Sequence, residues 1–197
     1  MTKDLKSQIN NILLKSNLKT DNTEQFLDYF NILIKWNSKI NIISKKEENI
    51  AEKLFAPSML FFQLTHSGSI HRIVDLGSGS GFPAIPIKIY DKNIDITMID
   101  ANVKKTAFLN FVCTKLNIKC KIINRKIDNL NQNDFDKKKI DAVTVRGVNI
   151  NSNIVKILKN TIGAKWLIHF TSYSITLPLE LKETLSMYGI AVKKYKL

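Results

Sequence analysis

The stretch Ile73-Val74-Asp75-Leu76-Gly77-Ser78-Gly79-Ser80-Gly81-Phe82-Pro83 decides the fold of this chain. Its first four residues form a short, largely apolar run that is typical of a buried strand. The glycines that follow at alternate positions indicate a tight turn, because residues without a Cβ let the main chain bend sharply and let a ligand approach it. Pro83 predicts the start of a helix, since proline suits the first helical turn.

A second apolar run follows at Ile94 to Ile99, and it ends in a carboxylate, Asp100. A strand, a glycine turn, a helix, a strand and an acid in this order are typical of the first half of a doubly wound nucleotide-binding sheet. Asp100 lies 21 residues after Gly79 (100 − 79), a spacing from which a carboxylate reaches both hydroxyls of a ribose. The stretch therefore predicts a site for a nucleotide-like cofactor.

Two kinds of cofactor fit this unit, a nicotinamide or flavin dinucleotide and S-adenosylmethionine. The dinucleotide fingerprint is G-x-G-x-x-G, and Phe82 stands where its third glycine would be. This chain has G-x-G-x-G instead, with Asp75 two residues before the first glycine. The pattern favours a cofactor without a pyrophosphate, and Asp75 is expected to hold the loop or the aminoacyl end of that cofactor. An NAD-dependent oxidoreductase stays open as the less favoured alternative.

The composition of the 197 residues is that of a globular chain, with 44% hydrophobic and 24% charged residues. No apolar run is long enough to cross a bilayer and the first residues lead into no signal peptide, so we expect a cytoplasmic protein without membrane contact. The formal net charge is +13. Such a positive field favours polyanionic partners, although a genome biased toward Lys, Asn and Ile codons would also produce it.

The nucleophilic and titratable residues show no pattern for metal binding or covalent catalysis. The two cysteines, Cys113 and Cys120, have neither a metal-ligand nor a disulfide-framework spacing, and we expect both to pack in the core. The three histidines, His66, His71 and His169, are scattered along the chain. The sequence therefore predicts no metal.

The hydrophobic periodicity divides the chain into an N-terminal helical extension at residues 1–66, packed on the core, and a cofactor-binding domain at residues 67–197. In the second part strands alternate with helices, which predicts an α/β fold with a parallel, Rossmann-like sheet and right-handed crossovers. We expect a helix at residues 47–63 of the extension, strands at 73–76, 94–99, 118–123, 140–145, 164–170 and 190–195, and later helices at 101–115, 151–160 and 178–187.

The segment from Asp75 to Pro86 resembles the cofactor loop of the glucose-inhibited division protein B family, the bacterial 16S ribosomal RNA (guanine-N7)-methyltransferases. The Gly-Phe-Pro-x-Ile-Pro string at residues 81–86 is fairly specific, and a Trp-Asn-x-x-x-Asn string at residues 36–41 adds to it. The resemblance implies a class I S-adenosylmethionine-dependent methyltransferase sheet with an N-terminal helical extension. It also implies methyl transfer from S-adenosylmethionine to N7 of a guanine in 16S ribosomal RNA.

The resemblance also implies which residues form the site. The family's Arg-Val-Glu segment falls on residues 126–128, and its Ser-Arg-Ala segment falls on residues 145–147. Asp100 is expected at the ribose, and Arg146 at the reacting centre as the catalytic residue. Together with the glycine pattern, the expected cofactor-binding residues are Asp75, Gly77, Gly79, Gly81, Phe82, Asp100, Ile127, Asp128 and Arg146.

The chain departs from the family pattern in three places. Residues 54–58 read Leu-Phe-Ala-Pro-Ser where the family carries His-Ile-Leu-Asp-Ser, and Phe170-Thr171 stands where it carries Lys-Gly. The chain also ends at Leu197, after what the alternation counts as the penultimate strand, so we expect the final edge strand to be missing. A basic RNA-binding protein on a degenerate, inactive methyltransferase scaffold therefore stays open as an alternative.

The chemistry of the implied reaction agrees with the residues that are present. Guanine N7 carries a free lone pair and no proton, so its methylation needs neither a general base nor a covalent cysteine. Placing N7 in line with the methyl group can supply most of the acceleration. A cytosine-C5 methyltransferase would need an activated cysteine, and neither cysteine of this chain fits. The implied partner is 16S ribosomal RNA or the small ribosomal subunit, bound by a monomer.

Overall fold

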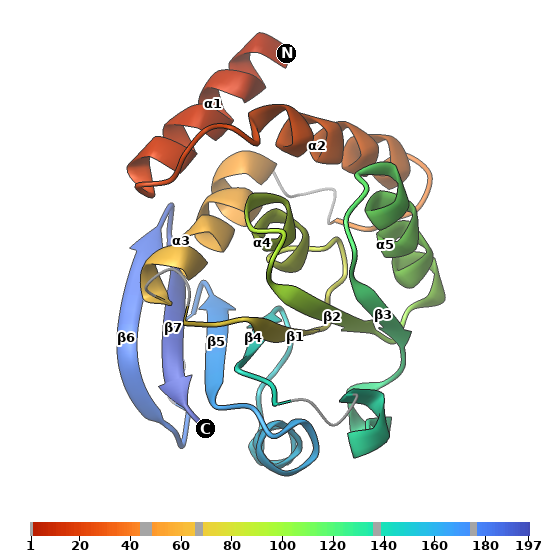
Figure 1. The fold of residues 1–197 in the computed structure, drawn as a ribbon, viewed down its shortest axis with the longest axis vertical. Helices are drawn as coiled ribbons and strands as arrows, with labels where there is room; N and C mark the ends of the chain where they lie inside the picture. Colours follow the sequence, from red (N-terminus) through yellow and green to blue (C-terminus); the bar gives the residue numbers. More distant parts are fainter. Residues whose placement is uncertain (1, 44–48, 66–68, 136–138, 174–176) are drawn as a thin grey trace.

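A computed structural model describes residues 2–43, 49–65, 69–135, 139–173 and 177–197 of the chain. Its centre is a seven-stranded sheet in the order β3-β2-β1-β4-β5-β7-β6, seen in Figure 1 with β6 at one side and β3 at the other. The strands are β1 (Arg72–Leu76), β2 (Asp95–Asp100), β3 (Lys121–Asn124), β4 (Ala142–Arg146), β5 (Trp166–Thr171), β6 (Glu180–Met187) and β7 (Ile190–Lys196).

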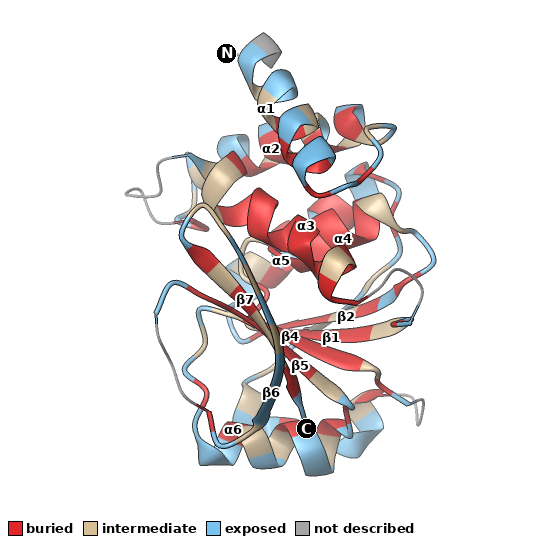
Figure 2. Cartoon of the chain, turned by 90° about the vertical axis from the view of Figure 1, so that its left-hand side faces the viewer, coloured by how far each residue is buried: buried red, intermediate tan, exposed pale blue. Residues whose placement is uncertain are grey.

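Helices cover both faces of this sheet. Figure 2 shows α1 to α5 on one face and α6 on the other, so the α/β fold class is confirmed. The α-helices are α1 (Thr2–Lys15), α2 (Thr23–Asn37), α3 (Ala56–Leu64), α4 (Ala84–Tyr90), α5 (Val103–Lys115) and α6 (Ser152–Lys156). Short helical segments of other kinds are η1 (Ala51–Phe55), η2 (Ile127–Asn129), η3 (Gln132–Phe135) and η4 (Ile157–Ile162).

The first five strands run parallel, as the alternation of strands and helices predicts. β1 lies between β2 and β4, and its Asp75 stands opposite Met98 of β2 and Thr144 of β4. Because parallel strands end at the same edge of a sheet, the residues after Leu76, Asp100 and Arg146 gather at one edge. This edge carries the candidate site.

The prediction of a helix at residues 178–187 is wrong, because Glu180–Met187 is strand β6. From Glu183 onward its residues alternate between half-buried and exposed, which is the period of a strand. β6 pairs with β7 across a two-residue turn, Tyr188-Gly189, in which both residues have positive φ, +50° and +77°. Such turns favour hairpins. The prediction that the final edge strand is missing is wrong for the same reason, because the segment expected to be a helix supplies that strand. β7 in turn pairs antiparallel with β5.

Three smaller differences concern element boundaries. The helix expected at 151–160 is α6 followed by the π-helical segment η4, which ends at Gly163 with φ +68°. The third strand begins at Lys121 rather than at residue 118. The helix expected at 47–63, interrupted near Pro57, is η1 followed by α3.

Helix α3 is apolar on nearly all sides, and eight of its nine residues are buried. This burial is expected for a helix enclosed by other elements, and α3 packs against α1, α4 and the β6–β7 hairpin. Figure 2 shows α3 and α4 in the buried colour between the outer helices and the sheet. In the described part of the chain, no helix is both long and apolar enough to cross a membrane.

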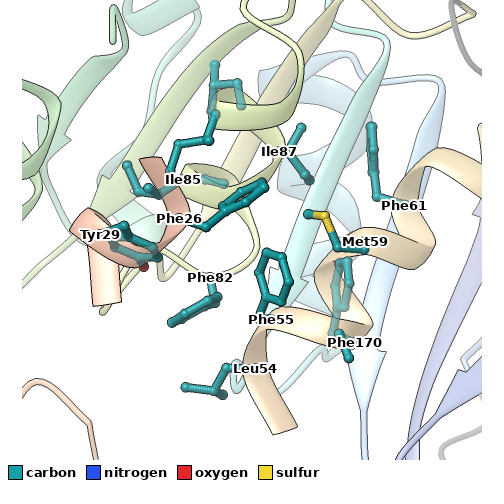
Figure 3. Close-up of a cluster of buried hydrophobic side chains, with 14 of the residues drawn as sticks. Phe26, Tyr29, Leu54, Phe55, Met59, Phe61, Phe82, Ile85, Ile87 and Phe170 are labelled. Carbon is teal, nitrogen blue, oxygen red and sulfur yellow. The ribbon is translucent and has the colours of Figure 1, made fainter. Parts of the chain in front are cut away.

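Aromatic rings join the N-terminal helices to the glycine turn (Figure 3). The ring of Phe55 lies 4.8 Å from that of Phe26 and 5.9 Å from that of Phe30. Tyr29 lies 5.2 Å from Phe82, which comes from the turn after β1. The N-terminal helices and the sheet therefore share one apolar core. The boundary expected between residues 66 and 67 lies outside the described residues, and the division into two parts stays a prediction.

Phe55→Ala tests whether the helices and the sheet unfold together. The Phe55 ring is fully buried, so its loss should lower the free energy of unfolding by about 3–5 kcal/mol. Urea unfolding followed by circular dichroism and by tryptophan fluorescence should still give one coincident transition. Leu14→Ala is the control, because Leu14 is 62% exposed and its loss should cost less than about 0.5 kcal/mol. Two separate transitions would contradict a shared core.

Candidate functional site

The glycine turn after β1 is anchored to the neighbouring strand β2. The amides of Gly77 and Ser78 both donate to the carbonyl of Ile99, at 2.8 and 3.0 Å. A Cβ at Gly77 would lie 2.5 Å from Cγ2 of Val148, which is closer than real Cβ atoms approach. Only glycine therefore fits at position 77, between β1 and the loop after β4.

Asp100 at the end of β2 holds the middle of the turn. The Gly79 amide donates to Asp100 Oδ2 at 2.8 Å, and the Asn102 amide donates to Oδ1 at 2.8 Å. Gly79 has φ +53°, a conformation that glycine adopts without strain. Asn102 in turn caps α5, because its side chain accepts from the amides of Lys104 and Lys105. One carboxylate thus links the glycine turn to the start of α5.

A cavity of about 300 Å³ opens beside Asp100. It brings together four of the expected site residues, Gly77, Asp100, Ile127 and Asp128. The complete lining is Gly77, Ile99, Asp100, Ala101, Arg125, Lys126, Ile127, Asp128 and Ile154. The wall that carries Asp128 is fixed to α6, because the side-chain Nδ2 of Asn153 donates to Asp128 Oδ1 at 2.9 Å.

Asp75 lies beneath the turn and is buried. The Thr144 hydroxyl donates to its Oδ1 at 2.6 Å, whereas its Oδ2 has no hydrogen-bond partner among the described residues. Burial raises the pKa of Asp75 from 3.8 to about 7, and the hydroxyls of Thr144 and Ser78 oppose the rise. Its carboxyl is therefore poised to change charge near neutral pH.

A second cavity, of about 390 Å³, lies at the ends of β4 and β5. Arg146 lines it, and the Arg146 Nη2 donates to the carbonyl of Lys53 in η1 at 2.6 Å. Val148 lines this cavity and Gly77 lines the first one. Because Val148 packs directly over Gly77, the two cavities are neighbours. The structure thus brings Arg146 to the second cavity and Asp100 to the first.

His169 is the buried titratable group of the second cavity. Burial, followed by the positive charge of Lys193, lowers the pKa of His169 to about 4. The imidazole is therefore neutral near pH 7, and its Nδ1 has no hydrogen-bond partner among the described residues. Within the described ranges, no three His, Cys, Asp or Glu side chains are grouped as metal ligands would be.

Gly81 and Phe82 lie on the packed side of the turn, away from the first cavity's lining. A Cβ at Gly81 would lie 2.5 Å from Cγ1 of Ile85. The Phe82 side chain is buried in the apolar core (Figure 3). Tyr29 donates from its hydroxyl to the carbonyl of Ser80 at 2.5 Å. This end of the turn is thus held by packing against α2 and α4.

Sequence reasoning missed three residues that shape the site and gave only a weak signal for a fourth. Asn102 had a visible signal, since an Asn before a helical pattern is a common N-cap. Lys105 is the residue with the weak signal, because a cation in a first helical turn opposes the helix dipole. In the structure its Nζ would lie 3.9 Å from a Cβ at Gly79. Thr144 and His169 gave no local signal, because their place depends on which strands become neighbours.

Comparison with known sequences identifies relatives. Residues 22–177 match the family model described as rRNA small subunit methyltransferase G (GidB). A curated relative from Clostridium botulinum (strain 657 / Type Ba4), named "Ribosomal RNA small subunit methyltransferase G", is 34% identical over 73% of this chain and 60% of its own length. One of the same name from Dictyoglomus thermophilum is 35% identical over 64% of this chain and 53% of its own length. The chain thus spans somewhat more than half the length of these relatives.

Comparison with solved structures supports the fold. A S-adenosylmethionine-dependent methyltransferase from Aquifex aeolicus matches with a TM-score of 0.59 at 12% identity, over 84% of this chain and 98% of that one. A Pyrococcus abyssi tRNA (uracil-54, C5)-methyltransferase matches with a TM-score of 0.54 at 14% identity, over 69% and 37%. Since the family model covers most of the chain, the chain belongs to the family of rRNA small subunit methyltransferase G.

Proposed function

We propose that this chain transfers a methyl group from S-adenosylmethionine to N7 of a guanine in 16S ribosomal RNA. The observation that carries the proposal is the Asp100 carboxylate, which lines a cavity beside the glycine turn. Sheets of this kind bind nucleotides at the carboxyl ends of their strands. The curated relatives named "Ribosomal RNA small subunit methyltransferase G" support the choice of ribosomal RNA.

The residues of the first cavity fit the nucleoside part of S-adenosylmethionine. Each oxygen of Asp100 accepts one main-chain N–H and retains a second lone pair, which can accept a ribose hydroxyl. Ile127 and Ile154 offer apolar sides to the adenine. The volume of about 300 Å³ lies at the lower end of small-molecule sites, about 300–1,000 Å³. The methionine part would extend past Gly77 toward the second cavity.

Asp75 supports the same placement. Its Oδ2 is buried without a hydrogen-bond partner among the described residues, and a buried carboxylate oxygen of this kind is stabilised by a cation or a donor. The α-ammonium of the methionine part supplies such a charge, directly or through a water molecule. In this arrangement Asp75 holds the aminoacyl end, while the glycine turn lies between it and the nucleoside.

The second cavity would receive the guanine. S-adenosylmethionine, held by Asp100 and Asp75, would supply an activated methyl group to the lone pair of N7, and its sulfur would leave as a neutral thioether while the purine takes the positive charge. No proton leaves, so the protein's task is to place the base in line with the methyl group. Arg146 lines this cavity and can donate to O6 of guanine, as arginine commonly does.

The charge of the chain agrees with an RNA substrate. A formal net charge of +13 draws a polyanion to the protein by long-range attraction. We propose that the protein acts as a monomer in the cytoplasm, where small ribosomal subunits are found. The departure at Phe170-Thr171 from the family's Lys-Gly would then affect how the RNA is held.

Methyl transfer tests the proposed function directly. The chain is incubated with tritiated S-adenosylmethionine and small ribosomal subunits from cells that lack this methylation. Label should appear in 16S RNA and should be recovered as 7-methylguanosine after nuclease digestion. Cofactor binding without any transfer, to subunits or to free 16S RNA, would point instead to an inactive scaffold.

Asp100→Ala should weaken cofactor binding. The substitution leaves ribose hydroxyls unpaired in the cavity and frees the Gly79 amide, at a cost of roughly 1–3 kcal/mol, so the Kd for S-adenosylmethionine should rise about tenfold or more. Isothermal titration calorimetry measures it. Asp95→Ala is the matched control, because Asp95 begins the same strand at the opposite edge and its side chain is 68% exposed. Equal affinity in both variants would refute the ribose assignment.

Asp75→Asn should change how stability depends on pH. The unfolded chain loses this proton near pH 3.8, whereas the native protein keeps it to about pH 7. Between these values the native state binds more protons, so raising the pH favours unfolding. The asparagine side chain cannot ionise, so the free energy of unfolding of Asp75→Asn should rise relative to that of the natural chain as the pH increases from about 4 to about 7. The total rise should be about 4 kcal/mol at most. Urea unfolding at several pH values measures the difference, and a constant difference would mean that Asp75 is already ionised at pH 4.

Arg146→Ala should lower the rate of methyl transfer more than it lowers RNA affinity. A residue that orients the base acts mainly in the transition state, so kcat should fall about tenfold or more. Arg146 also bonds the Lys53 carbonyl, so thermal unfolding is measured in parallel, and Arg146→Lys serves as a second variant that keeps the charge. Full turnover with Arg146→Ala would leave Arg146 without a role in the reaction.

A further inference from the structure

A groove between α2 and α5 lies outside both cavities of the candidate site. Its volume is about 520 Å³. The floor is aromatic and aliphatic and the rim carries three lysines. The lining consists of Ile32, Lys35, Trp36, Lys39, Ile40, Phe111 and Lys115. In Figure 1 the end of α2 and the segment after it lie beside α5.

Two aromatic rings make the floor. The Trp36 ring lies 5.2 Å from that of Phe111 and 5.5 Å from that of Phe108. Phe108 is buried and its ring packs against that of Trp36, whereas Phe111 is 38% exposed. A large apolar ring left open to solvent, held by packing from behind, is a ready surface for stacking.

Hydrogen bonds hold the two walls of the groove in place. Gln25 donates from its side chain to the Leu116 carbonyl at 2.8 Å, which fixes α2 against the end of α5. After α2, the amides of Ile42 and Ile43 donate to Asn37 Oδ1 at 2.9 and 2.8 Å. The two walls therefore have a set spacing, and the occupant need not reorganise them.

All charged residues on the rim of the groove are positive. Lys35, Lys39 and Lys115 line the groove, and its lining residues include no acid. The Lys115 Nζ lies 5.7 Å from the centroid of the Phe111 ring. An exposed aromatic floor with a cationic rim is the arrangement by which proteins bind single-stranded nucleic acid, with bases on the rings and phosphates at the lysines.

We propose that this groove binds a single-stranded segment of RNA that flanks the nucleotide to be methylated. The proposal rests on the proposed function for the choice of RNA. Phe111 stacks an unpaired base, and the three lysines contact the phosphates on either side. Helix α5 begins beside the Asp100 cavity, and Phe111 and Lys115 lie about 12 and 18 Å further along it, at 1.5 Å per residue. One short RNA segment can therefore reach both the groove and the site.

Binding of a fluorescein-labelled single-stranded RNA of about a dozen nucleotides tests the proposal. Fluorescence anisotropy is measured over a salt series with the full chain. Replacing Lys35, Lys39 and Lys115 together by Gln should reduce the log–log salt slope by about two, because each lysine that neutralises a phosphate contributes roughly 0.7 for a single strand. The control replaces three other exposed lysines by Gln, Lys156, Lys159 and Lys196, and so removes the same charge. Equal loss of affinity in the two triple variants would overturn the groove assignment.

Phe111 provides a second and independent readout. Phe111→Ala should weaken RNA binding about tenfold, and Phe111→Leu should weaken it about as much, since leucine keeps the apolar volume but cannot stack. The salt slope should stay unchanged in both. Full binding by Phe111→Leu would mean that no base stacks there.

Two further measurements separate this proposal from its competitors. All groove variants should keep the affinity of the natural chain for S-adenosylmethionine. If the natural chain binds the RNA through the groove but does not bind S-adenosylmethionine, the proposed function is wrong and the RNA-binding groove is still supported. If the groove variants instead lose binding to phosphatidylglycerol vesicles and keep RNA binding, the groove faces a lipid surface and the proposal is wrong.

Discussion

The carboxylate of Asp100 is the point on which the candidate site depends. It accepts the amide of Gly79 with one oxygen and the amide of Asn102 with the other, so the glycine turn and the start of α5 are set by a single side chain. The parallel pairing of β1 with β2 makes this possible, because both strands then end at the same edge. These hydrogen bonds fix the wall of the cavity beside Asp100.

The N-terminal helices do more than cover the sheet. Tyr29 of α2 bonds the carbonyl of Ser80 in the turn. The carbonyl of Lys53 in η1 accepts a hydrogen bond from Nη2 of Arg146. The Lys53 Nζ donates to the carbonyl of Tyr188 at 3.0 Å. Arg146, which lines the second cavity, is thus held by a residue that precedes the sheet in sequence. Substitutions in these helices should therefore affect the position of Arg146 and of the glycine turn as well as the stability of the fold.

The sequence predicted those parts of the structure that are formed by residues close together in the chain. The turn, Gly77, and Asp100 lie within one strand–turn–helix–strand unit, so spacing alone placed them together. Thr144 beneath Asp75 and Val148 over Gly77 depend on strand order, which no short stretch encodes. Strand β6 was mistaken for a helix because the apolar residues of 179–187 fit either period. Tyr188-Gly189 was its one local signal, and the positive φ of Tyr188 is uncommon for a tyrosine.

The β6–β7 hairpin has a consequence for the order of folding during synthesis. Lys53 bonds Tyr188, which is made 135 residues later, and the Leu64 carbonyl accepts from the Nζ of Lys194, which is made 130 residues later. Contacts this distant in sequence close slowly, since a long loop must be ordered before they form. Helix α3, apolar on nearly every side, leaves the ribosome long before the strands that cover it. The nascent chain therefore passes through an interval in which the face of α3 that β6 and β7 later cover is still exposed.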